Sequence, residues 1–176
     1  MNEVIEMMKT RRSIRKFKPD ALPDEIIEQI AEAGTYAATG KNLQSPTIIA
    51  VTNKQLRDRI SEMNRKIGGW QEGFDPFYGA PAMLIVLADK NVPTAVYDGS
   101  LVMGNLMLAA HSLGVGSIWI HRAKEEFESE DGKAILAELG ITGDHIGIGH
   151  CALGYIDGEE PKAAPRKENW VYYAKI

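Results

Sequence analysis

Cysteine is almost absent from this chain, in which Cys151 is the only one among 176 residues. A single cysteine cannot form an intramolecular disulfide, which excludes a disulfide-stabilised fold and favours a reducing compartment, the cytoplasm. A charge of one sign is also lacking, because 20 Lys and Arg stand against 24 Asp and Glu, for a formal net charge of −4. Such a balance creates no overall field that attracts nucleic acid or an anionic membrane. We therefore expect a cytoplasmic protein without a nucleic-acid or membrane partner.

Features of a secretory signal are missing, because the first residues carry acids where a signal peptide carries bases and no apolar core follows. One long run, residues 99–121, contains no Asp, Glu, Lys or Arg, and its length alone would suit a membrane span. The run includes Asn105 and His111, and the segment SLGVG at 112–116 interrupts it. We therefore interpret it as a buried helix followed by a buried strand.

The chain length suits one domain, and we assign residues 1–176 to it. Hydrophobic periodicity and turn residues place helices and strands in a mixed order, too irregular for repeated βαβ units. Helices are expected at 2–9, from about 23 to 34, 54–67, 95–113 and 124–139, and strands at 47–51, 82–88, 116–121 and 146–155. The stretches 39–46 and 68–81 are predicted loops, and the last twenty residues are predicted to form an extended arm with an aromatic end.

A basic cluster occupies residues 9–18, with Ser13 among its arginines and lysines. Arginine forks and a hydroxyl match the geometry of a phosphate dianion, which accepts bidentate charge-assisted hydrogen bonds. The same cluster also suits a solvated helix end, where cations complement the helix dipole. Composition leaves both interpretations open.

The loop at 39–44 combines small residues with the side-chain amides of Asn42 and Gln44. Small residues allow close approach of the backbone to a ligand, and amides can pair with the edge of a planar heterocycle, as they do with bases. A plain connection between a helix and a strand is the alternative.

Familiar catalytic and metal-binding motifs are missing. No glycine pair follows a strand and opens a helix as GxGxxG requires, and no P-loop is present. The histidines lack the spacing of a metal site, so we expect no metal. Cys151 follows His150, but neighbouring strand residues point to opposite faces, so a cysteine hydrolase stays only an alternative to a buried, inert cysteine.

Five segments, in this order and spacing, resemble the FMN-dependent nitroreductase family. They are RRSIR at 11–15, ATGKNLQ at 38–44, DGSLVMGNLMLAAHSLGVGSIWI at 98–120, ALGY at 152–155 and PRK at 165–167. The resemblance implies an α+β fold with a central, mainly antiparallel sheet flanked by helices. It also implies an intertwined homodimer with exchanged C-terminal arms and two FMN sites at the interface.

The resemblance also implies a set of cofactor-binding residues. Arg11 and Ser13 match positions that hold the FMN phosphate and ribityl chain, Arg12 contributes through its backbone, and Arg15 matches the cation at the pyrimidine edge of the flavin. Arg166 and Lys167 match phosphate contacts near the C-terminus. The remaining contacts to the flavin ring are implied for Ala38, Thr39, Gly40, Asn42 and Gln44 of the other subunit, and for Ile120, His121 and Arg122 after the strand.

The implied activity is transfer of a hydride from NADH or NADPH to flavin N5 and then to a small planar acceptor such as a nitroaromatic or a quinone, with ping-pong kinetics. The flavin carries the chemistry, so no side chain is assigned as a catalytic acid or base. Trp70, Phe74, Phe77 and Tyr78 could form a lid on the loop 68–81, or they could be packed aromatics of a surface loop. The alternative function is a non-redox module that holds a phosphorylated ligand or RNA with residues 9–18.

Overall fold

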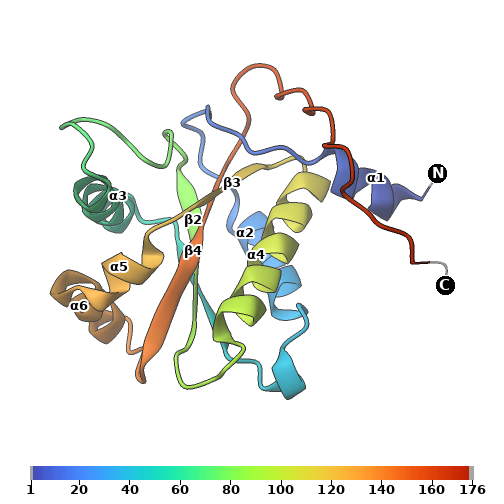
Figure 1. Ribbon diagram of the computed structural model, residues 1–176. Helices are drawn as coiled ribbons and strands as arrows, with labels where there is room; N and C mark the ends of the chain where they lie inside the picture. Colours follow the sequence, from blue (N-terminus) through green and yellow to red (C-terminus); the bar gives the residue numbers. More distant parts are fainter. Residues whose placement is uncertain (1, 175–176) are drawn as a thin grey trace.

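One antiparallel sheet organises the computed structural model, which describes residues 2–174 (Figure 1). Its strands are β1 (Pro46–Val51), β2 (Ala82–Asp89), β3 (Gly116–Ile120) and β4 (His145–Gly154). They lie in the order β1-β2-β4-β3, and each neighbouring pair is antiparallel. The predicted α+β class, with a central antiparallel sheet, is therefore confirmed.

Helices cover both faces of this sheet (Figure 1). On one face lie α2 (Asp24–Thr35) and α4 (Ala95–Ser112), with α1 (Glu3–Thr10) packed against α4. On the other face lie α3 (Lys54–Gly68), α5 (Ala123–Glu128) and α6 (Glu130–Glu138). The sheet therefore separates two hydrophobic cores, and β2, which is buried along nearly its whole length, contributes alternate side chains to both.

The long uncharged run forms α4 and β3, as predicted. Gly114 separates them with a φ of 71°, a conformation that glycine adopts without steric cost. Within residues 2–174, no helix is both long enough and apolar enough to cross a membrane.

The helical region expected at 124–139 divides into two helices at Ser129. The backbone of Ser129 is extended, with ψ 160°, and its hydroxyl accepts the N–H of Gly132 to cap α6. A side chain at Gly132 would place its Cβ 2.1 Å from the carbonyl oxygen of Glu126. The serine cap and the close approach at this glycine explain why the helix does not continue.

The buried face of α3 contains both apolar and polar residues. Ile60 is buried as expected, but Ile67 is 40% exposed, and the polar residues Arg57, Ser61 and Asn64 are buried instead. These polar side chains can be buried because they find hydrogen-bond partners on other elements. On α1, the apolar side formed by Val4, Ile5 and Met8 is exposed.

The C-terminal segment 158–174 contains no helix or strand and is exposed throughout. It leaves the end of β4 and runs back past α1 (Figure 1). Trp170 and Tyr172, near its end, are 64% and 82% exposed. The prediction of an extended arm with an aromatic end is confirmed for the described residues.

Candidate functional site

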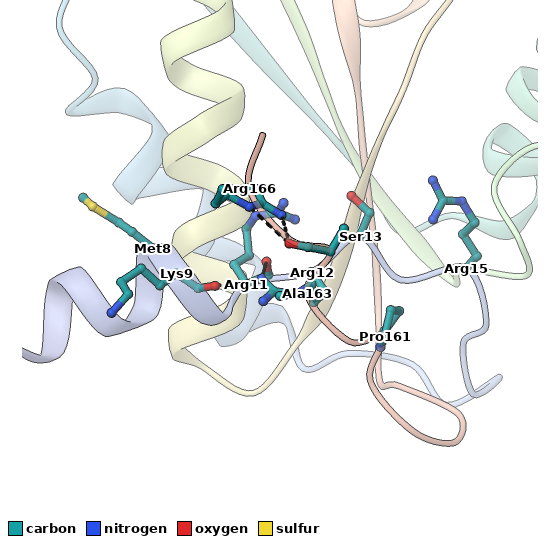
Figure 2. Close-up of a pocket in the computed structure, with 10 residues that line it drawn as sticks. Met8, Lys9, Arg11, Arg12, Ser13, Arg15, Pro161, Ala163 and Arg166 are labelled. Atoms are coloured by element: carbon teal, nitrogen blue, oxygen red, sulfur yellow. Dashed lines mark hydrogen bonds between the residues drawn. The ribbon is translucent and has the colours of Figure 1, made fainter. Parts of the chain in front are cut away.

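A basic cavity of about 720 Å³ lies between the end of α1, the segment that follows it and the C-terminal arm (Figure 2). Five predicted site residues line it together, namely Arg11, Arg12, Ser13, Arg15 and Arg166. Lys167, also predicted, does not line the cavity. Its ammonium group lies over the ring of Trp170, 5.1 Å from the ring centroid.

The backbone after α1 is held in place by β3. The helix ends at Thr10, and Ser13 then forms a parallel bridge with Ser117, while the N–H of Ile14 donates to the carbonyl of Ser117 at 3.0 Å. This short pairing extends the segment along the sheet edge. The side chains of Arg11 and Ser13 are thereby carried on backbone that the sheet supports.

The cavity has an excess of positive charge, because Lys9 pairs with Glu6 while no ion pair is found for its arginines among the described residues. Arg11 is partly buried, and its Nη1 has no partner among the described residues. Burial, with a further contribution from the charge of Arg12, lowers the pKa of the Arg11 guanidinium. Within residues 2–174, the Arg12 guanidinium donates to the carbonyls of Lys9 and Arg11, at 2.8 and 2.7 Å. A buried cation without a counter-ion is costly, so this cavity fits an anion such as a phosphate.

The loop at 39–44 forms a short 3₁₀ turn (Gly40–Asn42) with unusual backbone angles. Lys41, Asn42 and Gln44 have positive φ values of 52°, 55° and 49°. The loop is held by Asp98, a buried side chain of α4 that accepts the N–H of Gly40 at 2.9 Å. The role of Asp98 in holding this loop was not predicted from the sequence, because a single acid in an apolar helix matches no motif.

Asp98 also accepts the hydroxyl of Thr94 at 2.9 Å and that of Ser45 at 3.3 Å. Three donors from two segments thus converge on one buried carboxylate. The loop borders a second cavity of about 380 Å³, which includes Thr39 and Gln44 in its lining. Ala38, Gly40 and Asn42 lie on the same loop but do not line that cavity.

The turn after β3 carries the last group of predicted residues. Ile120 is buried, His121 is exposed, and Arg122 has a φ of 82°. The guanidinium of Arg122 lies over the ring of Trp70, 4.4 Å from the centroid. Within the described part of one chain, this turn, the loop 39–44 and the basic cavity do not form a single cavity.

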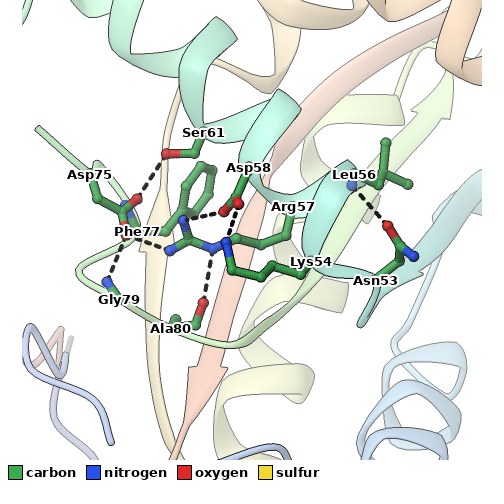
Figure 3. Close-up of polar contacts among 10 residues, drawn as sticks. All are labelled: Asn53, Lys54, Leu56, Arg57, Asp58, Ser61, Asp75, Phe77, Gly79 and Ala80. Carbon is green, nitrogen blue, oxygen red and sulfur yellow. Dashed lines mark hydrogen bonds and ion pairs between the residues drawn. The ribbon is translucent and has the colours of Figure 1, made fainter. Parts of the chain in front are cut away.

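The glycine-rich loop 68–81 is confirmed as a loop, but its second half is fixed to α3 (Figure 3). Asp75 forms an ion pair with the buried Arg57 and accepts the hydroxyl of Ser61 at 2.8 Å. Arg57 Nε also donates to the carbonyl of Ala80 at 3.0 Å. Phe77 is fully buried, so of the two alternatives for this residue the structure favours a packed aromatic over a lid.

Cys151 and His150 lie on opposite faces of β4, as the sequence predicted. Cys151 is fully buried in the core beneath α4, and burial raises the pKa of its thiol to about 12. A thiol of this pKa carries almost no thiolate at neutral pH, and the thiolate is the nucleophile. His150 contacts Glu126 on the opposite face of β4. These observations remove the support for a cysteine hydrolase.

Comparisons with known proteins agree with this architecture. The sequence profile of the Nitroreductase family matches residues 8–155. A relative in Archaeoglobus fulgidus, named provisionally as an NADH dehydrogenase/NAD(P)H nitroreductase, is 31% identical over 165 residues, which cover 91% of this chain and 89% of that protein. A relative of the same name in Methanothermobacter thermautotrophicus is 32% identical over 126 residues. That match covers 66% of this chain, which spans only 60% of the relative.

Solved structures include a nitroreductase with bound FMN from Bacteroides fragilis. Its TM-score is 0.89 at 29% identity, and the match covers 99% of this chain and 100% of that one. The family match spans most of the chain, and the superposition spans nearly all of it. The chain therefore belongs to the nitroreductase family.

Proposed function

We propose that this protein is an FMN-dependent NAD(P)H oxidoreductase that reduces small planar acceptors such as nitroaromatics or quinones. The observation that carries the proposal is the basic cavity, in which the partly buried Arg11 has an unpartnered Nη1. The bound FMN of the Bacteroides fragilis protein and the NAD(P)H in the name of the Archaeoglobus relative support the choice of cofactor and electron donor.

The residues present fit the phosphate end of FMN. Arg11, Ser13 and Arg166 would hold the phosphate and the ribityl chain by charge-assisted hydrogen bonds, with Arg12 contributing through its backbone. Lys167 follows Arg166 in the chain and would reach the phosphate only after leaving its contact with Trp170. Because the segment after α1 and the C-terminal arm both bring cations to the cavity, a bound dianion would relieve the repulsion between them.

The flavin ring would lie beyond this cavity. Arg15 would sit at its pyrimidine edge and stabilise negative charge that develops there on reduction. The turn of Ile120, His121 and Arg122 would contact the ring. Bound FMN would supply hydride-transfer chemistry at N5 between NADH or NADPH and the acceptor, and we expect ping-pong kinetics.

A homodimer with exchanged arms would complete the site. Val96, Tyr97 and Leu101 on α4 are at least half exposed, as is the apolar side of α1, and such surfaces usually mark an interface. A second copy would cover them and bring its Ala38, Thr39, Gly40, Asn42 and Gln44 to the ring. The single cysteine, as a free thiol, suits the cytoplasm as location.

The test is the visible spectrum of the protein after saturation with FMN and removal of free flavin, followed by anaerobic titration with NADH and with NADPH. The proposal predicts a yellow protein whose flavin absorbance is bleached by at least one of the two nucleotides. A protein that retains no flavin contradicts it. If such a protein binds inorganic phosphate or RNA instead, the non-redox alternative is the better account of the basic cavity.

A further inference from the structure

A buried polar network lies beneath the turn that follows β3. Its members are Asn64 of α3, Glu126 of α5 and His150 of β4, and each has an exposed fraction of 0%. His150 Nε2 is 2.6 Å from Glu126 Oε2, and Asn64 Nδ2 donates to Glu126 Oε1. Three elements that are distant in the sequence thus meet in one set of hydrogen bonds.

The two ends of this network hold consecutive carbonyl groups of the turn. His150 Nδ1 lies 3.1 Å from the carbonyl oxygen of Ile120, and Asn64 Nδ2 donates to the carbonyl oxygen of His121 at 2.8 Å. A carbonyl only accepts, so His150 Nδ1 carries a proton, and Nε2 shares one proton with Glu126. The network therefore fixes the direction of both carbonyls.

A fixed carbonyl also fixes the N–H of the next residue. No described peptide bond is cis, and in a trans peptide the C=O and the N–H point in opposite directions. Because the carbonyls of Ile120 and His121 point into the network, the N–H groups of His121 and Arg122 point away from it. Neither N–H has an acceptor within residues 2–174.

The turn itself is in a conformation that needs support. Arg122 has a φ of 82°, in the left-handed region that non-glycine residues adopt at a cost. Two successive outward N–H groups next to such a residue form a concave donor pair suited to an electronegative atom. The pair lies at the far end of β3 from Ser117, a span of about 13 Å along four residues of strand. Ser117 pairs with Ser13 of the basic cavity.

We propose that Asn64, Glu126 and His150 are positioning residues that aim the N–H groups of His121 and Arg122 at the electronegative edge of the bound flavin ring. This inference rests on the proposed function. It gives the network a role that stability does not explain, because buried polar groups of this kind are often replaced by apolar ones at no loss. Asn64 Oδ1, moreover, is buried without a partner among the described residues, which is itself a cost.

The first test is the midpoint potential of bound FMN in three variants. Asn64→Leu removes the donor to the His121 carbonyl and should lower the potential, because N–H donors stabilise the extra charge of reduced flavin. A tenfold loss of preference for reduced over oxidised FMN corresponds to about 30 mV for a two-electron couple. Glu126→Gln should keep the potential of the unmodified protein, since the introduced side-chain amide can accept from Asn64 and donate to His150 Nε2.

Ile135→Val is the matched control, because Ile135 is buried in the same core and its side chain cannot hydrogen-bond to the turn. This variant should lower the melting temperature and leave the potential unchanged. A purely structural network predicts instead that Asn64→Leu behaves like Ile135→Val, and that result overturns the inference.

The second test uses the unmodified protein and does not depend on the folding of a variant. Amide hydrogen exchange, followed by NMR with and without FMN, should slow at His121 and Arg122 when FMN binds. If FMN binds and both amides exchange as in its absence, the inference fails while the proposed function stands. If the unmodified protein binds no FMN, the proposed function fails first.

Discussion

At the scale of single residues, Arg11 differs from the other cations of its cluster. Lys16 pairs with Asp157, and Lys18 is exposed, whereas Arg11 is partly buried with a nitrogen that has no partner among the described residues. The site therefore contains an unsatisfied donor before any ligand arrives. A phosphate oxygen at this nitrogen would gain a charge-assisted hydrogen bond without displacing a protein acceptor.

Arg11→Ala should weaken FMN binding roughly thirtyfold, because a charge-assisted hydrogen bond contributes about 2 kcal/mol. Lys18→Ala is the control, since it removes the same charge from a residue that does not line the cavity. Calorimetric titration of both variants with FMN measures the difference. Equal affinities in the two variants would show that general charge, and not Arg11, holds the ligand.

At the scale of elements, α3 and the loop 68–81 act as one unit. Asp75 joins them through Arg57, Ser61 and the N–H groups of Phe77 and Gly79, the last at 2.8 Å. Burial alone would raise the pKa of Asp75, but the hydrogen bonds from Arg57 and from the two N–H groups outweigh burial and lower it. The ionised form of Asp75 therefore stabilises the folded state.

The lowered pKa of Asp75 predicts a pH dependence of stability. The folded state binds this proton more weakly than the unfolded chain, so the stabilisation is present above about pH 4 and is lost as the pH falls through the lower folded-state pKa. Asp75→Asn should reduce the free energy of unfolding at pH 7 by about 2 kcal/mol, because it removes the charge-assisted hydrogen bond between the buried Arg57 and Asp75 and leaves Arg57 with Asp58 as its carboxylate partner. The variant should also lose less of its free energy of unfolding than the unmodified protein does as the pH falls below about 4.

Urea unfolding at a series of pH values measures both effects. Glu138→Gln is the control, because the pair of Glu138 with Arg59 is exposed and contributes less than about 1 kcal/mol. If Asp75→Asn and Glu138→Gln have equal free energies of unfolding at pH 7, the contacts of Asp75 do not contribute the stability assigned to them.

Helices and strands were predictable from the sequence where their signals lie in neighbouring residues. The all-apolar run of β2, the proline start of α2 and the Asn53 cap of α3 each depend on neighbouring residues, and all three agree with the structure. Asn64 and Asp98 were not predictable as buried groups, because their partners come from elements far away in the sequence. Periodicity carries no signal for such contacts.

The basic cavity was predictable in part. The arginines after α1 suggested a phosphate site by composition, but the meeting of residues 11–15 with Arg166 depends on the return of the arm past α1. That return is a property of the tertiary fold. The resemblance to the nitroreductase family, not residue pattern, linked the two segments.

At the scale of the whole molecule, the exposed arm and the exposed apolar side of α1 and α4 predict an obligate dimer. Deleting residues 165–176 should give monomeric or insoluble protein that retains no FMN, because the deletion removes Arg166 together with the aromatic end of the arm. Arg166→Ala in the full-length chain is the control, and it should stay dimeric with weakened FMN binding. Gel filtration with absorbance detection measures both properties. A soluble yellow dimer after the truncation contradicts the role of the arm.

The central claim is that two chains together build each FMN site, because one chain leaves the predicted contacts in separate places. Two defective proteins test it, Arg11→Ala/Arg15→Ala and Asn42→Ala/Gln44→Ala. Each homodimer carries two damaged sites. After the two proteins are unfolded, mixed and refolded, a heterodimer with shared sites collects both defects in one site and leaves the other native.

The measurement is NADH- or NADPH-dependent reduction of a nitroaromatic or quinone by the refolded mixture, once gel filtration has shown that both parent proteins fold and dimerise. The account predicts that activity returns, at about half the value of the unmodified protein per heterodimer, since two-fold symmetry makes the sites equivalent. If heterodimers form and activity stays absent, each site lies within one chain, and the assignment of Asn42 and Gln44 to the partner's flavin is wrong.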